Sequence, residues 1–326
     1  MQRQGLILVT GANGFIGRAL CSRLASDNKV VGVDNSGPGD RALDIDWEMT
    51  DLTDLNSLTA MCKQYSPALI IHCAGIAHQK IGAVDFATYK RINSEATENL
   101  AKAAAKINPG VVFIFLSSVS VYGEGNLSIP VSEESECHPS SDYAASKRDA
   151  ERRLIELSDK GIIHNLFILR LAPVYDREWA LNLDRRVFAP KKLVYLRFGS
   201  GTQKMSALAR PNFVDLIQFL LKRPLQDSGV NILNVCDAEA YEFNTIIRVF
   251  RKSAIQQHRL IISVPLSVLW LATRIAGVLF ANKKRWLHSS YDKLASDLVF
   301  DIREMMAIGF TPVHSLESVF DAEIAE

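Results

Sequence analysis

Three glycines at three-residue spacing follow the first apolar run of the chain. Residues 5–10 are apolar and partly β-branched, which predicts a short buried strand, and Gly11, Gly14 and Gly17 come directly after it. A helical apolar pattern starts inside the glycine segment, at Phe15. In a strand–loop–helix unit, glycines let the backbone approach a pyrophosphate, and the helix N-terminus offers unpaired N–H groups. The stretch therefore predicts a dinucleotide site, although a glycine-rich turn alone is a weak signal.

Acidic residues at the ends of the next two predicted strands fit such a site. The run 29–34 ends on Asp34, where a carboxylate can accept hydrogen bonds from the adenosine ribose and repel the extra phosphate of NADP. This position favours NAD, and the plain alternative is a solvated aspartate. Asp51 follows a predicted strand at 46–49, and it either contacts the adenine amine or caps the helix that starts near Asp54.

Strand and helix patterns alternate five times through the first half of the chain. Helices are predicted at 54–66 and 86–106, and strands at 68–75 and 111–116. The run 111–116 is apolar throughout, as is typical of a parallel sheet covered on both faces. The pattern predicts an α/β fold with a doubly wound parallel sheet (Rossmann).

Small and polar side chains stand at the expected carboxyl edge of this sheet. Ala74 and Gly75 end the run 68–75, where small residues would let a cofactor pass close to the backbone, unless they only form a turn. Residues 117–123, which are rich in serine, follow the run 111–116 and reach the same edge.

A tyrosine and a lysine four residues apart follow on a further predicted helix. Tyr143 and Lys147 share one helix face, because residues at this spacing are neighbours. A phenol is a poor base at neutral pH, but a neighbouring ammonium favours the phenolate and lowers its pKa. We therefore predict that Tyr143 carries a proton, that Lys147 assists it, and that a serine from 117–123 donates to the reacting oxygen. Taken alone, such a pair is usually only helix surface.

The order of these motifs resembles the extended short-chain dehydrogenase/reductase family, specifically its NAD-dependent nucleotide-sugar epimerase/dehydratase branch. The resemblance spans nearly the whole chain and includes later segments at 169–175, 212–216 and 308–317. It implies that Ser118, Tyr143 and Lys147 are catalytic. The cofactor contacts it implies come from Gly11, Asn13, Gly14, Phe15, Ile16, Gly17, Asp34, Asn35, Asp51, Leu52, Ala74, Gly75, Asn93, Tyr143 and Lys147.

The resemblance leaves more than one reaction open. Dehydratases of this branch usually carry Asp-Glu after the catalytic Ser/Thr, whereas this chain has Val119-Ser120, which disfavours dehydration. The prediction is a 4-epimerase of a hexose or N-acetylhexosamine on a nucleotide or polyprenyl diphosphate, acting through a 4-keto intermediate. A 4-ketosugar reductase needs the same residues. A dinucleotide-sensing protein without turnover is the alternative of another class, and the intact Ser, Tyr and Lys argue against it.

Two domains are expected, with residues 1–170 binding NAD and residues 171–326 forming a smaller substrate domain interleaved with the sheet. The substrate contacts are expected from Ser118, Ser120, Asn182, Lys204 and Arg210. Asp176 departs from the family pattern, which usually has glycine there, and the usual arginine before 212–216 has no clear counterpart. These departures weaken the expectation of a standard UDP-sugar grip.

Composition excludes several other classes. The 37 basic and 36 acidic side chains nearly cancel, so no overall field favours nucleic acid. The five cysteines and seven histidines lack the spacing of metal or redox sites, so no metal is expected and the thiols fit a reduced, cytoplasmic protein. The first strand starts by Leu6, which leaves no room for a secretion signal. The family resemblance also implies a homodimer.

The segment 260–286 is strongly apolar. Pro265 divides it into a short strand and a helix of about four turns, which is below the roughly 20 residues that span a bilayer and is interrupted by Arg274. It is either a buried helix of the domain or an interfacial helix with residues 283–286 at the headgroups. The second interpretation would give a peripheral contact with the inner face of a membrane through residues 265–286.

Overall fold

The computed structural model describes residues 5–39, 43–77, 84–123, 127, 129–223, 229–253, 259–280 and 284–321. The chain divides into two compact units. Unit 1 comprises Met1–Val121, Ser141–Arg170 and Val214–Leu233, and unit 2 comprises Tyr122–Ser140, Leu171–Phe213 and Asn234–Glu326. The chain thus passes between the units at residues 121–122, 140–141, 170–171, 213–214 and 233–234. The division into an NAD-binding and a substrate domain stays a prediction.

Unit 1 is built on a seven-stranded sheet in the order β11-β6-β5-β4-β1-β2-β3. The pairs β1–β2, β1–β4, β2–β3 and β4–β5 are parallel. The strands are β1 (Ile7–Thr10), β2 (Val30–Asp34), β3 (Asp46–Met49), β4 (Leu69–His72), β5 (Val112–Ser118), β6 (Asn165–Leu171) and β11 (Gly229–Val235). The predicted doubly wound sheet is therefore confirmed.

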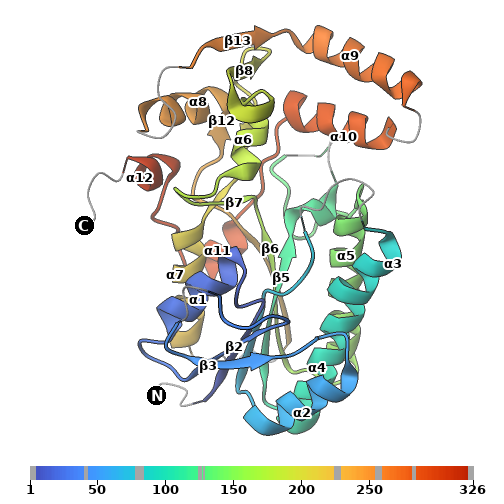
Figure 1. The fold of residues 1–326 in the computed structure, drawn as a ribbon, viewed down its shortest axis with the longest axis vertical. Helices are drawn as coiled ribbons and strands as arrows, with labels where there is room; N and C mark the ends of the chain where they lie inside the picture. The colour runs from blue at the N-terminus through green and yellow to red at the C-terminus, as the bar shows by residue number, and fades with distance from the viewer. Residues whose placement is uncertain are drawn as a thin grey trace. The chain divides into compact units, whose positions relative to one another are not determined.

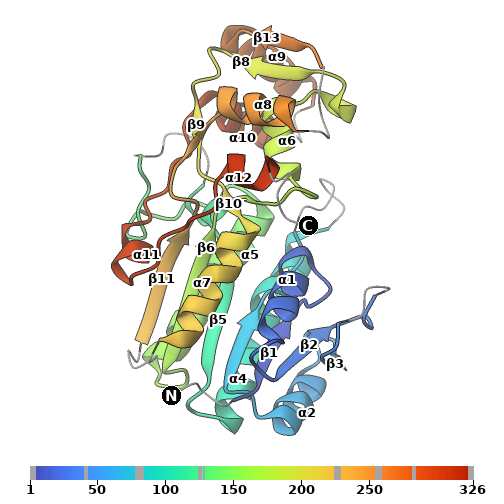
Figure 2. The same ribbon diagram turned by 90° about the vertical axis from the view of Figure 1, so that its left-hand side faces the viewer.

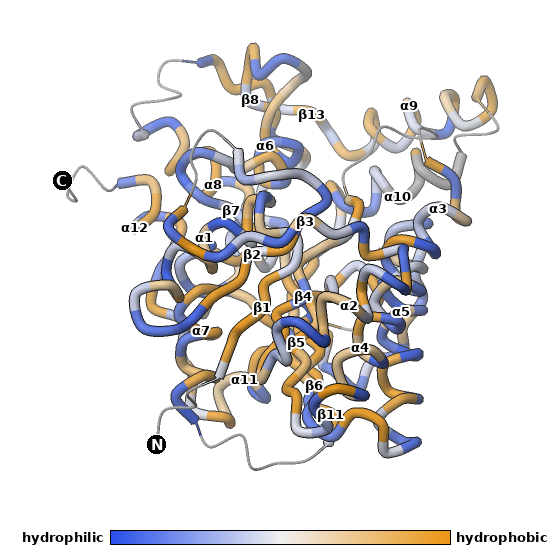
Figure 3. The backbone as a smooth tube through the Cα atoms, turned by 60° about the horizontal axis from the view of Figure 1, so that its bottom comes forward, coloured by the Kyte–Doolittle hydropathy of each residue, from blue (hydrophilic) through white to orange (hydrophobic). Residues whose placement is uncertain are grey.

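Helices cover both faces of this sheet, as expected for strands that are apolar on both sides. In Figures 1 and 2, α1 and α7 lie on one face, and α2, α4 and α5 lie on the other. These helices are α1 (Phe15–Leu24), α2 (Leu55–Tyr65), α4 (Ala96–Ile107), α5 (Asp142–Asp159) and α7 (Arg210–Lys222). Leu58, Leu100 and Leu154 of α2, α4 and α5 join a fully buried core with strand residues such as Ile70 and Phe113. Figure 3 shows β1 and β4 as hydrophobic (orange) stretches of the tube.

The predicted helix 86–106 is not uniform. It consists of α3 (Phe86–Lys90), one π-helical turn (Arg91–Glu95) and α4. A π-helical turn adds a residue to the helix and is frequent at functional sites.

Unit 2 contains three small sheets, in which β7 pairs with β10, β9 with β12 and β8 with β13. Its strands are β7 (Val174–Tyr175), β8 (Tyr195–Phe198), β9 (Lys204–Met205), β10 (Leu208–Ala209), β12 (Tyr241–Glu242) and β13 (Ile261–Val264). Its helices are α6 (Leu181–Val187), α8 (Phe243–Lys252), α9 (Leu266–Leu279), α10 (Lys284–Ala295), α11 (Arg303–Ala307) and α12 (Leu316–Phe320). Aromatic side chains fill its core, where the rings of Phe188 and Tyr195 stack with centroids 4.4 Å apart.

The strand and helix predicted on the two sides of Pro265 are β13 and α9. Among the described residues, no helix is both long enough and apolar enough to cross a membrane.

Candidate active site

The glycine loop between β1 and α1 is closed tightly by its backbone. Gly11 has a φ of +66°, and a Cβ atom there would lie 2.8 Å from the backbone nitrogen of Ala74. A Cβ on Gly17 would collide with the Gly11 carbonyl oxygen. Gly14 is the N-cap of α1, so no side chain caps the helix, and its first turn holds no acidic residue. A helix N-terminus with no side-chain cap and no nearby acidic residue fits the pyrophosphate of a dinucleotide.

Asp34 ties the end of β2 to this loop. Its carboxylate accepts hydrogen bonds from the backbone N–H of Asn13 (3.0 Å) and of Asn35 (2.9 Å), and from the Ser36 hydroxyl (3.3 Å). The Asn13 amide in turn donates to Ser36 Oγ (3.0 Å). This geometry places the carboxylate at the carboxyl edge of the sheet beside the glycine loop. Its contact with a ribose stays a prediction.

The alternative that Asp51 caps a helix is not what the structure shows. Asp54 is the N-cap of α2 and accepts hydrogen bonds from the N–H groups of Asn56 and Ser57. Asp51 instead accepts from the N–H and hydroxyl of Thr53, both at 2.8 Å. Leu52, beside it, is half-buried. The proposed adenine contact of Asp51 stays a prediction.

Asn93 fixes the loop that follows β4. Its side-chain oxygen accepts from the Ile76 N–H (2.8 Å), and its amide donates to the Ile76 carbonyl (3.0 Å) and to Ser146 Oγ (3.0 Å). A Cβ on Gly75 would approach the Asn93 oxygen to 2.9 Å. The π-helical turn that carries Asn93 thus holds residues 75–76 in place, and the contact of Asn93 with the cofactor stays a prediction.

A buried chain of hydrogen bonds links the carboxyl ends of β1 and β4 to α4. Thr10 Oγ1 lies 2.7 Å from His72 Nδ1, and His72 Nε2 lies 2.8 Å from Thr97 Oγ1. Thr10 Oγ1 also accepts from the Ala74 N–H (3.2 Å). Burial lowers the pKa of His72 to about 3, so the imidazole is neutral and acts as a structural link. This network joins β1, β4 and α4.

Lys147 is buried, with its ammonium group close to the end of β5. Its Nζ donates to the Leu116 carbonyl (2.8 Å) and lies 4.7 Å from the centre of the Phe115 ring. Burial lowers the pKa of Lys147 to about 8, against the opposing influence of Cys73 and Glu151. Positive charge is therefore held inside the protein at the carboxyl end of β5.

Tyr143 and Ser118 meet at this edge. The Ser118 hydroxyl is close enough to the Tyr143 phenol to influence its pKa, and Ser118 Oγ accepts hydrogen bonds from the Ser120 hydroxyl (2.9 Å) and N–H (3.2 Å). The expected lowering of the Tyr143 pKa is wrong for the protein alone. Burial raises the pKa of Tyr143 to about 12, although the nearby Ser118 hydroxyl opposes this rise. The ring of Tyr89 lies edge-on to Tyr143, with centroids 6.5 Å apart.

A second buried charge network lies behind the catalytic helix. Arg170 on β6 makes two hydrogen bonds to Glu151 on α5, at 3.0 and 2.9 Å, and the Ser117 hydroxyl donates to the same carboxylate at 2.5 Å. Both charged side chains are almost completely buried. The network joins α5, which carries Tyr143, to β5 and β6. The motif Leu169-Arg170 therefore has a structural role.

The substrate residues expected in unit 2 lie on different elements. Arg210, at the start of α7, pairs with Asp176 at 2.5 Å, so a diphosphate would have to compete with this carboxylate. Asn182 lies in the first turn of α6 and Lys204 on β9. Their contact with a substrate stays a prediction.

The later motifs meet in a buried cluster around Asp237, which sequence reasoning missed. Its carboxylate accepts from the hydroxyls of Tyr175 (2.8 Å) and Tyr241 (2.9 Å) and from the side-chain amide of Asn212 (2.7 Å). Burial raises the pKa of Asp237 despite these donors. The segments 169–175 and 212–216 are therefore linked in unit 2 by structural hydrogen bonds. Ser146 and Thr10 were also missed as supporting residues, although both lie inside quoted motifs.

Comparisons with known proteins identify the family of the chain. The family model of the NAD dependent epimerase/dehydratase family matches residues 7–236. A UDP-glucose 4-epimerase of Vibrio cholerae is 29% identical over 321 residues, which cover 96% of this chain and 93% of that protein.

Solved structures of similar fold include two sugar epimerases. The UDP-glucose 4-epimerase of Thermotoga maritima with UDP-glucose has a TM-score of 0.74 at 19% identity and covers 97% of this chain and 96% of its own. The UDP-glucuronic acid 4-epimerase of Bacillus cereus in complex with NAD has a TM-score of 0.73 at 22% identity, with coverages of 98% and 97%. At these identities the structures establish the fold.

The chain belongs to the NAD-dependent epimerase/dehydratase family. The predicted family, the Rossmann fold and NAD as the cofactor are thereby confirmed, and the protein is an NAD-dependent enzyme of this family.

Proposed function

We propose that the protein is a 4-epimerase of a hexose or N-acetylhexosamine carried on a nucleotide or polyprenyl diphosphate. The observation that carries this proposal is that Tyr143 and Lys147 lie one turn apart on α5, with the buried Lys147 ammonium held at the end of β5 that also carries Ser118. Because β1, β4 and β5 are parallel, this group lies at the same sheet edge as the glycine loop. The match along nearly the full length of the Vibrio cholerae UDP-glucose 4-epimerase supports the reaction type.

The three side chains have distinct tasks in such a reaction. Tyr143 accepts the proton of the C4 hydroxyl when a 4-ketosugar forms, and it returns the proton to the inverted alcohol. When bound at the glycine loop, NAD would supply the hydride chemistry for removal and return of the C4 hydrogen. The net reaction therefore consumes neither proton nor reductant. The Lys147 charge stabilises the phenolate that the reaction requires, and Ser118 donates a hydrogen bond to the reacting oxygen.

The segment after Ser118 supports epimerisation rather than dehydration. Water loss needs an acid and a base beside the sugar, and the positions that usually supply them hold Val119 and Ser120. Val119 is buried, and the Ser120 side chain donates to Ser118. Ser120 thus orients the Ser118 hydroxyl and, with it, contributes to the sugar site.

The residues that bind the substrate diphosphate are proposed as a set of candidates. Asn182 and Lys204 are the polar candidates of unit 2, and Arg210 would join them only by leaving Asp176. We also propose, from the family resemblance, that the enzyme works as a homodimer in the cytoplasm.

The test is conversion of sugars by the purified protein without added cofactor. UDP-glucose, UDP-N-acetylglucosamine and a polyprenyl-diphosphate N-acetylhexosamine are each incubated with the protein, and C4 inversion is followed by NMR. We expect bound NAD and inversion of at least one sugar. Tyr143→Phe should reduce the rate about 100-fold or more, because it removes the proton carrier. Tyr65→Phe, a half-buried tyrosine on α2, is the matched control and should convert sugar at the wild-type rate.

Two other outcomes would replace the proposal. If the protein lacks NAD and oxidises added NADH in proportion to a supplied 4-ketosugar, it is a 4-ketosugar reductase. A third result is a protein that binds NAD but neither inverts nor reduces any of these sugars, with NAD binding unchanged in Tyr143→Phe. This result would favour the dinucleotide-sensing alternative.

A further inference from the structure

Helix α9 in unit 2 has two apolar sides. One side is buried or half-buried and carries Leu266, Leu269, Thr273, Ala276 and Gly277. The helix packed against α9 is α10. The opposite side, here called the outer stripe, consists of Val268, Leu271, Ile275, Val278 and Leu279, with 56, 53, 53, 82 and 70% of each side chain exposed.

The outer stripe is unlike the solvent face of an ordinary helix. Its members recur at helical spacing and form one continuous apolar face, where a soluble helix carries charged side chains. The one charged residue of α9, Arg274, lies beside the stripe, and its guanidinium stacks 5.0 Å from the centre of the Trp270 ring. Large exposed apolar patches mark binding surfaces.

The apolar exposure extends from α9 into the preceding strand. Leu260, Ile261 and Ile262 are 75, 39 and 48% exposed. Figure 1 shows β13 and α9 following one another along one end of unit 2. The membrane contact predicted from the sequence extends to residue 286. Residues 281–283 and the side chains of residues 284–286 lie outside the described part of the chain.

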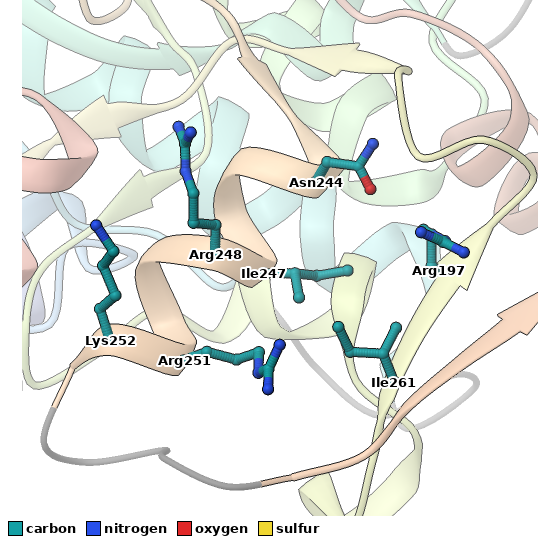
Figure 4. A pocket seen from close by; sticks show the side chains of 7 residues that line it. All are labelled: Arg197, Asn244, Ile247, Arg248, Arg251, Lys252 and Ile261. Carbon is teal, nitrogen blue, oxygen red and sulfur yellow. The ribbon is translucent and has the colours of Figure 1, made fainter.

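A cationic cavity adjoins this apolar segment. It has a volume of about 440 Å³, and Ile261 of β13 lies in its wall together with Arg197, Arg248, Arg251 and Lys252 (Figure 4). Arg197 donates to the Ser263 hydroxyl at 2.7 Å, which holds its guanidinium beside β13.

Within the part of the chain that the structure describes, little negative charge compensates this cavity. Among the described residues, the carboxylate within ion-pair distance of the four cations is that of Glu317, 3.7 Å from Arg248. An anionic partner would therefore complement the cavity.

An anionic bilayer fits both features better than a second copy of the chain. Lipid supplies an apolar layer for the outer stripe and phosphates for the cations within one surface. In a two-fold symmetric dimer formed through this face, the cationic cavities of the two copies would approach each other. Their like charges would repel. The 14 residues of α9 rise about 21 Å, so the helix would lie in the interface.

We propose that unit 2 docks on an anionic lipid bilayer, with the outer stripe of α9 at the acyl boundary and the cationic cavity on headgroup phosphates. This proposal goes beyond the sugar reaction and does not depend on it. It would place the enzyme where substrates carried on lipid diphosphates are found.

The test is flotation of the NAD-bound protein with vesicles of phosphatidylcholine, with and without phosphatidylglycerol. We expect wild type to float with the anionic vesicles and less with the neutral ones. Leu271→Glu with Ile275→Glu should lower the vesicle partition coefficient about tenfold or more, because two charges replace apolar contacts. Val313→Glu, an equally apolar residue of unit 2 that is 76% exposed, is the matched control and should float as wild type.

The cations are tested separately. Arg251→Gln with Lys252→Gln should lower the partition coefficient on anionic vesicles about fivefold per cation and leave neutral vesicles unaffected. Lys63→Gln with Lys106→Gln, two exposed lysines of unit 1, controls for net charge. The thermal unfolding midpoint of each variant confirms that it is folded.

Three results would overturn the proposal. One is wild type that stays in the soluble fraction with both vesicles. Another is equal flotation of the wild type and of the α9 variant. The third is a wild-type dimer that the α9 variant converts to monomer in the absence of lipid binding, which would assign the outer stripe to a second copy of the chain.

Discussion

Replacing Lys147 by methionine should remove a pH dependence that burial imposes on folding. Burial lowers the pKa of Lys147 from 10.5 to about 8. One pKa unit corresponds to about 1.4 kcal/mol, so keeping this lysine protonated in the fold costs roughly 3 kcal/mol. Between pH 8 and pH 10.5 the unfolded chain binds more protons at this site than the folded one. The free energy of unfolding of wild type should therefore rise with pH across this window.

The assay compares wild type and Lys147→Met by urea unfolding of the NAD-free protein at a series of pH values. The lost hydrogen bond to the Leu116 carbonyl lowers stability equally at every pH, so it cancels from the slope. The difference in unfolding free energy, wild type minus variant, should grow by roughly 3 kcal/mol from neutral pH to pH 10.5. Lys63→Met, an exposed lysine on α2, serves as the control. Parallel curves for wild type and Lys147→Met would refute the reasoning, because they would show that burial leaves this lysine's pKa unchanged.

Three further substitutions test the cofactor site and its support. Gly17→Ala should abolish NAD retention on gel filtration, since the added methyl collides with a loop carbonyl; full retention would contradict it. Asp34→Ala removes the negative charge and the acceptor for the Asn13 N–H, so the ratio of NAD to NADP affinity, measured by calorimetry, should fall about tenfold or more. An unchanged ratio would contradict the proposed contact of Asp34 with the ribose. Arg170→Met leaves the buried Glu151 with fewer partners and should cost about 3 kcal/mol in urea unfolding; a loss below 1 kcal/mol, roughly, would argue against the network.

Patterns local in sequence predicted most of unit 1. The apolar run before Gly11 and the run 111–116 each form one strand. The alternation of strands and helices then predicts a parallel sheet covered by helices on both faces. Residues 122–140 belong to unit 2 and residues 214–233 to unit 1, and these assignments depend on contacts with residues far away in the sequence. In unit 2, Val131 bridges to Phe300, a contact between residues far apart in the chain that no local pattern encodes.

The positions of the candidate site residues could be predicted in part. Position and spacing indicated Tyr143 and Lys147, and the structure places both at the carboxyl edge of the sheet. The sign of the Tyr143 pKa shift was wrong, since the depth of burial follows from packing around the ring and not from its neighbours in sequence. The Asp237 cluster was missed for a related reason, because its tyrosine and asparagine donors come from separate segments.

The most direct test of the central claim follows the hydrogen at C4 of the sugar. A UDP-hexose labelled with deuterium at C4 is incubated with the purified protein in ordinary water, without added NAD, and the product is examined by NMR. The account predicts inversion at C4 with the deuterium retained there, because the hydride leaves and returns within one site, and it predicts that Tyr143→Phe suppresses this conversion. Inversion with loss of the label to water would contradict the 4-keto mechanism.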